Sequence, residues 1–415
     1  MAVETGRLQV KREADLRKEL GEREDVKRAI RRLKEHWSGR GFGARRDLLT
    51  HALRLTRAMS PEIADTVQRC REVLGFERPV EVFVRPEPVF NAAIMKNDSG
   101  PVSLILSSRL LEVFTPGELC FVVGHELGHA YFDHFGIPMP ATAALTEMGV
   151  PYVPRYVSLQ LYAWTRSAEL TADRAGLICA QDPDAAASGF FKLASGMSSA
   201  RVKPDLETYA RQVESLAAVP LARRHIRDDD DTLDCFSTHP YSPVRVRAVY
   251  AFSKSAAYNK AIGKSGYGFS DEELESLVMR DLSLMEPGYL EEKTDHTDTL
   301  RRLLYSAGIV VAAANGRVDQ AEVDALNALL GDEYMGLPYN VENERGNLDG
   351  RLAAAVKDAP LVKRAQLVQH LAIIAGADGH VEDAELEVLR KVSNGLGVDF
   401  MVVTQTLDAA AAPMD

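Results

Sequence analysis

Apolar residues recur at helical spacing through the first 57 residues, separated by Lys, Arg and Glu. This pattern predicts amphipathic helices, with Leu8, Leu16, Leu20, Val26, Ile30 and Leu33 on their apolar faces. Glycines at positions 39, 41 and 43 interrupt it, and a second helix is predicted from Arg45 to about Met59. We interpret residues 1–59 as a basic helical segment that packs on the next domain or binds a partner or an anionic surface.

Beyond residue 60 the pattern predicts a small sheet between helices. Residues 80–84 alternate as a strand does, and Val102–Ser107 form a second predicted strand after a turn-rich stretch. Ser60 followed by Pro61 is typical of a helix start. Thr115-Pro-Gly-Glu118 is a capping box that opens another helix a few residues after the second strand.

That helix contains the strongest candidate chemistry, the sequence Val-Val-Gly-His125-Glu126-Leu-Gly-His129-Ala-Tyr. His125 and His129 are four residues apart, so they lie on one helical face and can share one Zn²⁺. Glu126 lies beside the first histidine and is placed to act as a general base on a water. The residues around it from Phe121 to Phe132 are otherwise uncharged, so a buried helix with these groups needs a partner for them. The alternative is a surface helix with two chance histidines.

A catalytic zinc needs a third protein ligand. Glu169 and Asp173 are four apart on one predicted helix, so Glu169 can bind the metal while Asp173 supports a ligand histidine. The alternative is a pair of solvated carboxylates. His134 is a weaker candidate because five residues after His129 it is expected to face elsewhere. The metzincin spacing fails because Phe132 and Phe135 occupy its Gly and third His positions.

These residues resemble the gluzincin family of HtpX-like and CAAX prenyl metallopeptidases over residues 60–255. Asn91, the strand Val102–Ser107 and the Thr238-His-Pro element followed by Arg245 are similar to further parts of that family. The resemblance implies that His239 stabilises an oxyanion or covers the metal, and that Arg245 supports the ligands; a structural role for His239 is the alternative. It also implies an edge strand that pairs with an extended substrate through Val102, Ser103, Leu104, Ile105 and Leu106.

Between the two candidate ligand segments, residues 135–164 hold four prolines and few charges. The prolines argue against one continuous helix, so we expect either a loop-rich lid near the site or a packed connector.

Charge and cysteine content limit the other function classes. The net charge is −11, although residues 1–57 hold 16 basic and 9 acidic residues, net +7. A chain this acidic is not expected to bind nucleic acid. Cys70, Cys120, Cys179 and Cys235 form no C-x-x-C pair, so neither a thiolate zinc site nor a disulfide framework is predicted. Without a signal sequence or a spanning segment, a soluble cytoplasmic protein is expected.

The last third contains a repeat with an offset of 63 residues. Asn315, Gly316 and Glu322 correspond to Asp378, Gly379 and Glu385, each set joining an apolar helix to an amphipathic one. This resembles the TerB-like domain of tellurite resistance, over residues 296–410, and predicts an all-α bundle. The acidic residues are interpreted as helix caps, with a hard-cation site as the alternative. Residues 256–295 are the predicted connector.

Together these patterns predict a mostly helical α+β fold, with a zincin-type catalytic domain and small sheet followed by an all-α bundle. The predicted function is a soluble zinc-dependent endopeptidase that cleaves an extended protein or peptide and is regulated or targeted by its C-terminal domain, which can have a protein partner of its own. The alternative is a non-catalytic, zinc-stabilised peptide-binding or stress-response interaction protein; the intact Glu126 favours catalysis.

Overall fold

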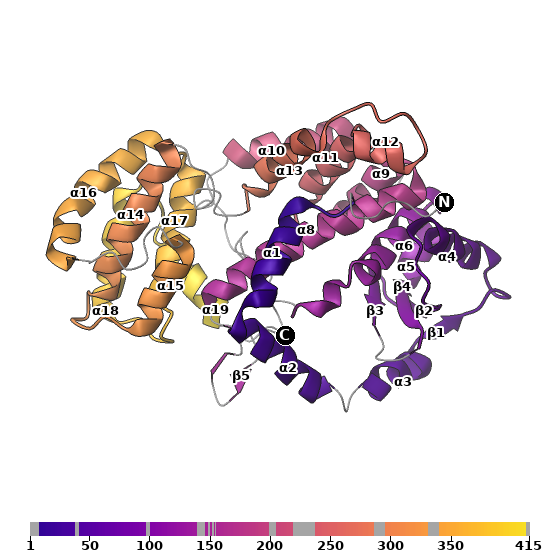
Figure 1. The fold of residues 1–415 in the computed structure, drawn as a ribbon, viewed down its shortest axis with the longest axis horizontal. Coiled ribbons are helices and arrows are strands. Elements are labelled where there is room, and N and C mark those ends of the chain that lie inside the picture. The colour runs from indigo at the N-terminus through magenta and orange to yellow at the C-terminus, as the bar shows by residue number, and fades with distance from the viewer. Residues whose placement is uncertain are drawn as a thin grey trace. The chain divides into compact units, whose positions relative to one another are not determined.

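The computed structural model of the 415-residue chain describes residues 8–37, 41–96, 100–138, 146–147, 150–151, 153, 155–198, 205–218, 237–285, 295–330 and 340–411. The chain divides into two compact units (Figure 1). The first comprises residues 1–142, 163–213 and 238–282, and the second comprises residues 143–162, 214–237 and 283–415. The predicted α+β, mostly helical fold is confirmed.

The first unit surrounds one four-stranded sheet. Its helical elements are α1 (Lys11–Glu22), α2 (Glu24–Trp37), α3 (Gly41–His51), α4 (Pro61–Leu74), α5 (Ser108–Val113), α6 (Pro116–Tyr131), the 3₁₀ turn η2 (His134–Gly136), α9 (Pro183–Ser195), α11 (Ser242–Ser253), α12 (Ala256–Ala261) and α13 (Asp271–Leu282). Two further helices, α8 (Arg155–Ala180) and α10 (Leu206–Ala218), cross the division between the units.

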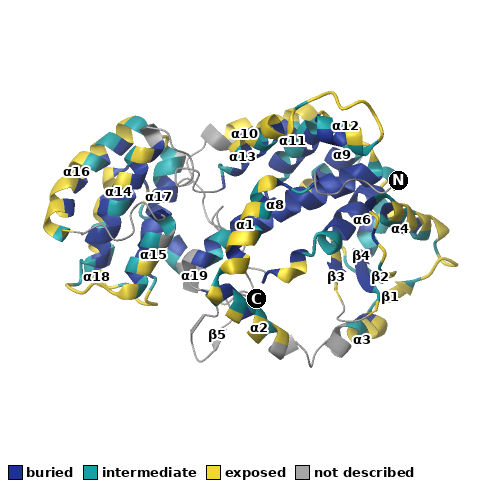
Figure 2. Ribbon diagram, viewed as in Figure 1, coloured by how far each residue is buried: buried dark blue, intermediate teal, exposed yellow. Residues whose placement is uncertain are grey.

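The strands lie in the order β1 (Leu53–Leu55), β2 (Val80–Arg85), β4 (Val102–Ser107) and β3 (Ala92–Met95). The β2 and β4 strands are parallel, and the two outer strands pair antiparallel to them. Because side chains alternate between faces, Leu104 and Leu106 join the core that contains α4 and α6, whereas Ile105 packs with Phe83 and with Leu48 of α3 on the other face. Figure 2 shows β4 and α6 as almost entirely buried.

Two sequence predictions about this sheet are wrong. The strand Val102–Ser107 is not an edge strand, because β2 and β3 pair with both of its edges and all six residues are buried. The two edges of the sheet are formed instead by β1 and β3. The predicted helix from Arg45 to Met59 ends at His51 in α3, because Leu53–Leu55 adds to the sheet opposite residues 82–84. Residues 1–59 are therefore not helical throughout.

The predicted start of the metal-motif helix is confirmed. The Thr115 hydroxyl accepts a hydrogen bond from the Glu118 amide at 3.4 Å, and the Glu118 carboxylate accepts one from the Thr115 amide at 2.7 Å. Lys192 and Ser188 of α9 also bind the Glu118 carboxylate, at 2.7 and 2.6 Å. These contacts fix the register of α6 and hence the direction in which its histidines point.

Part of the proline-rich stretch 135–164 is regular. It contains the hairpin β5 (Thr146–Glu147) and β6 (Val150–Pro151), and α8 already begins at Arg155. Residues 139–145, 148–149, 152 and 154 lie outside the described residues, so a lid at this position stays a prediction.

The C-terminal part of the second unit is an all-α bundle. Its helices are α14 (Asp295–Ala312), α15 (Gln320–Leu330), α16 (Val341–Asp358), α17 (Leu361–Ala375), α18 (Asp383–Gly395) and α19 (Met401–Ala411). In both repeat copies a glycine with positive φ, Gly316 or Gly379, follows the first helix. Glu322 and Glu385 each accept the amide three residues before them, at 3.2 and 2.8 Å, so the predicted capping role is confirmed. Within the described residues, no helix of either unit is long and apolar enough to cross a membrane.

Candidate metal centre

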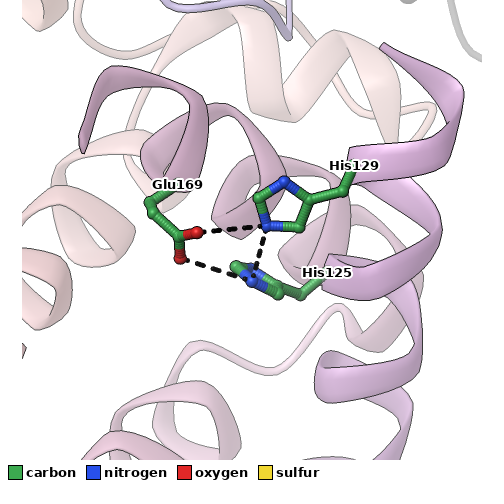
Figure 3. A group of neighbouring side chains, drawn as sticks. All are labelled: His125, His129 and Glu169. Atoms are coloured by element: carbon green, nitrogen blue, oxygen red, sulfur yellow. Dashed lines mark hydrogen bonds and ion pairs between the residues drawn. The ribbon is translucent and has the colours of Figure 1, made fainter. Parts of the chain in front are cut away.

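The two motif histidines and Glu169 meet in the first unit. His125 and His129 lie one turn apart on α6, and their Nε2 atoms are 3.1 Å apart. Glu169 reaches them from α8, with carboxylate oxygens 3.5 Å from His125 Nε2 and 3.3 Å from His129 Nε2 (Figure 3). The three potential ligand atoms all lie within 4.8 Å of one another.

The chemistry of these atoms fits a bound metal ion. Glu169 is 5% exposed, and among the described residues its Oε2 atom accepts no hydrogen bond, although Arg245 forms an ion pair with it. A buried carboxylate oxygen and two imidazole nitrogens that face one another need a shared cation, because each presents a lone pair to the same point. Two histidines and one carboxylate leave a coordination position for water or substrate, as catalytic sites require.

Small residues allow the two ligand helices to approach closely. A Cβ atom at Gly128 would lie 2.8 Å from the Ala175 Cβ, and one at Gly124 would lie 2.7 Å from the Cys179 Cβ. Conversely, a Cβ at Gly176 of α8 would lie 2.7 Å from the carbonyl oxygen of Phe121. The sequence analysis did not predict this close contact. The two glycines four residues apart in α6, and the small residues Ala172, Ala175 and Gly176 in α8, could have indicated it.

A second carboxylate orients His125 from behind. Asp173 Oδ1 lies 2.9 Å from His125 Nδ1, and Asp173 accepts two hydrogen bonds from Arg245 of α11, at 2.9 and 2.6 Å. Arg245 Nη2 also lies 3.3 Å from Glu169 Oε2. Burial alone raises the pKa of the Asp173 carboxyl, but the charge of Arg245 and the hydrogen bond with His125 outweigh it and hold that pKa below its usual value. The structure thus places Asp173 and Arg245 together behind His125, which agrees with the supporting roles that the spacing gave to Asp173 and the family resemblance gave to Arg245.

His239 lies on the open side of the site. Its Nε2 atom is 3.5 Å from Glu169 Oε1, and its side chain is 60% exposed. Burial raises the pKa of Glu169, but the charges of His239, His129 and Arg245 reverse that effect and hold it well below the usual range. Glu126, next to His125 on α6, is 7% exposed. By contrast, the predicted substrate strand, residues 102–106, lies inside the sheet and offers no free edge.

Sequence reasoning missed two groups that surround His129. His134 Nδ1 lies 2.8 Å from His129 Nδ1, so His134 does not face elsewhere as expected; it contacts a ligand instead of belonging to the ligand group. Burial lowers the pKa of His134 well below its usual range. Glu13 of α1 is fully buried nearby, and burial raises its carboxyl pKa. The position of Glu13 in the sequence could have indicated this burial, because Glu13 falls on the apolar stripe of α1 with Leu16 and Leu20.

Two histidines on one helix, a glutamate from a second helix and a glutamate between the histidines define the class of gluzincin metallopeptidase domains. The comparisons agree with this class. Residues 58–252 match peptidase family M48, and residues 301–402 match the tellurite resistance protein TerB. The chain therefore contains an M48 peptidase domain followed by a TerB domain, which confirms both resemblances found in the sequence.

One similar protein is the plastoglobule-localized metallopeptidase 48, chloroplastic, of Arabidopsis thaliana. It is 32% identical over 204 residues, which cover 47% of this chain and 57% of that protein. The chain thus spans little more than half the length of this relative. No solved structure matches the chain significantly.

Proposed function

We propose that this chain is a zinc-dependent endopeptidase. The observation that carries the proposal is the meeting of His125, His129 and Glu169 around one point, with Glu126 on the same helix. Nitrogen and oxygen donors in a set of three suit Zn²⁺. When bound, zinc lowers the pKa of a water and polarises a carbonyl group.

The remaining steps belong to the chain's own residues. Glu126 takes a proton from the attacking water and delivers it to the leaving amine. His239, exposed on the open side of the site, donates a hydrogen bond to the oxyanion that forms from the scissile carbonyl. Asp173 accepts the Nδ1 proton of His125 and so keeps its Nε2 lone pair directed at the metal.

The substrate is a protein or peptide bound in extended form. Of the two outer strands, β1 and β3, the one suited to this role is β3, because it packs against α6. A peptide added there would use backbone hydrogen bonds, which demand little of its sequence. This replaces the role that the sequence assigned to Val102–Ser107.

We further propose that the TerB domain regulates or targets the peptidase, through a protein partner or through access to the site. Its support is that it belongs to a separate unit, and that residues 294–415 hold 10 basic and 19 acidic residues, net −9. A cytoplasmic location is also proposed, because Cys70, Cys120 and Cys179 are buried free thiols.

The test of catalysis is the Glu126→Gln variant, assayed on an unfolded fluorogenic protein substrate at matched zinc content. Loss of the general base is expected to lower turnover by about 10²–10⁴-fold while zinc is retained. Glu112→Gln, which alters an exposed carboxylate on α5, is the matched control and should cleave normally. If the Glu126 variant cleaves at the wild-type rate, the chain is better described by the alternative, a non-catalytic peptide-binding protein.

A further inference from the structure

Helix α1 reaches the metal centre although it precedes the matched peptidase domain. The Val10 amide donates to Thr171 Oγ1 at 3.0 Å, and Arg174 donates to the Leu8 carbonyl at 3.4 Å. Both partners are on α8, the helix that carries Glu169. At the other side of α1, Arg17 donates to the carbonyl oxygens of Phe132 and Asp133, just after α6. The helix is therefore fixed to both ligand-bearing helices.

These anchors place the Glu13 carboxylate in the interior. Glu13 is 0% exposed, and its Oε1 atom accepts a hydrogen bond from Trp164 Nε1 at 3.3 Å. Gln9 Nε2 donates to its other oxygen. A buried carboxylate is costly unless several groups face it, and His134 Nε2 is one of them, 3.9 Å from Glu13 Oε1.

The contact between the rings of His129 and His134 indicates which nitrogen of each ring carries the proton. With its Nε2 lone pair turned toward the metal position, a neutral His129 carries its proton on Nδ1. That atom lies 2.8 Å from His134 Nδ1, which must then be the acceptor. His134 consequently carries its own proton on Nε2, the atom that faces Glu13 and that, within the described residues, has no hydrogen-bond partner. The opposite pair of tautomers would also give the contact one donor and one acceptor, but it would place a proton on His129 Nε2, where a ligand needs its lone pair.

We propose that Glu13, acting through His134, is a positioning residue for the metal ligand His129. The carboxylate attracts the Nε2–H of His134, fixes its tautomer, and leaves Nδ1 of His134 free to accept from His129. The ring of His129 is thereby held in its ligating orientation. The inference rests on the metal centre proposed above, and it gives the N-terminal segment a defined role there.

Zinc affinity tests this role without reference to proteolysis. The full chain is titrated by competition with a chromophoric chelator, as wild type and as Glu13→Gln. Loss of an outer-shell partner is expected to weaken zinc binding by about 10–100-fold. Asp15→Asn is the matched control: it removes the same charge from an exposed side chain of the same helix and should leave the affinity unchanged. An unchanged affinity in Glu13→Gln would overturn the proposal.

A double-mutant cycle separates positioning from general stability. His134→Phe should weaken zinc binding similarly, and adding Glu13→Gln should then have no further effect. Equal losses in both backgrounds would show that Glu13 does not act through His134. The visible spectrum of the Co²⁺-substituted protein should change in both single variants, because it reports ligand geometry.

A measurement on the wild-type chain keeps the inference testable even if a variant fails to fold. Nitrogen NMR of the zinc-loaded, histidine-labelled protein should show His129 protonated on Nδ1 and His134 on Nε2. The reverse tautomer of His134 would contradict the proposal. If these results hold while Glu126→Gln has no effect on turnover, the peptidase proposal fails and the positioning role stands.

Discussion

Replacing Gly128 by Ala tests whether the close contact of α6 with α8 is what assembles the metal centre. The new Cβ would lie 2.8 Å from the Ala175 Cβ and 3.2 Å from the Ala172 Cα. Apolar carbon atoms prefer about 3.5–4.0 Å, so the helices must separate by about 0.5–1 Å at this point. The separation increases the distance from His129 on α6 to Glu169 on α8.

Two free energies oppose each other in this variant. Overpacking of an interior contact costs about 1–3 kcal/mol, whereas replacing a helical glycine by alanine recovers about 0.5–1 kcal/mol. The net expectation is a destabilisation of about 1 kcal/mol, near the middle of a range from about 0 to 2.5 kcal/mol. The affinity for zinc should fall as well, because ligand distances tolerate only about 0.2 Å. We expect zinc affinity to fall by at least about tenfold.

Urea unfolding followed by tryptophan fluorescence measures the free energy of unfolding, since Trp37 and Trp164 both belong to the first unit. Competition with a chelator measures the affinity for zinc. The matched control is Gly21→Ala in α1, where an added Cβ has no atom within 4 Å and should be neutral or stabilising. If Gly128→Ala unfolds like the Gly21 variant and binds zinc as the wild type does, the close contact of α6 with α8 does not assemble the metal centre.

Three further predictions concern the bundle and the open side of the site. Burial raises the pKa of Glu322 to about 7 from its model-peptide value of 4.5, so its contribution to stability is complete below about pH 4.5 and is lost as pH rises through about 7. Glu322→Gln should therefore raise the unfolding midpoint of the bundle at alkaline pH, measured by circular dichroism, and an unchanged midpoint would contradict this. His239→Ala should retain zinc and thermal stability, because the side chain is 60% exposed, yet lose about 10²-fold in turnover; wild-type turnover would exclude its proposed role. A chain ending at residue 290 should still bind zinc but cleave the unfolded substrate at a rate changed several-fold, and identical kinetics would argue against regulation by the TerB domain.

Most of the candidate site could be predicted because its signals are local. His125 and His129 are related by one helical turn, and the Glu169 and Asp173 pair by another. The capping box at Thr115 and the two capped turns of the repeat are likewise set by residues three apart. Such spacings are visible in a single sequence because the helix itself fixes the geometry.

The missed features depend on pairings between distant segments. The four residues of β3 have no strong alternating pattern, so nothing in the sequence contradicts the edge position that the family resemblance implies for Val102–Ser107. Leu53–Leu55 is a strand only because β2 lies beside it. The contact of Glu13 with His134 joins segments more than a hundred residues apart, and only an acidic residue on an apolar stripe indicated it.

The central claim is that His125, His129 and Glu169 hold one zinc ion at a catalytic site. X-ray absorption at the zinc edge of the purified full chain tests it most directly. We predict one zinc per chain, surrounded only by nitrogen and oxygen at about 2.0–2.2 Å, and loss of that zinc in His129→Ala. A shell containing sulfur at about 2.3 Å, or a His129→Ala variant that keeps its zinc, would contradict the account.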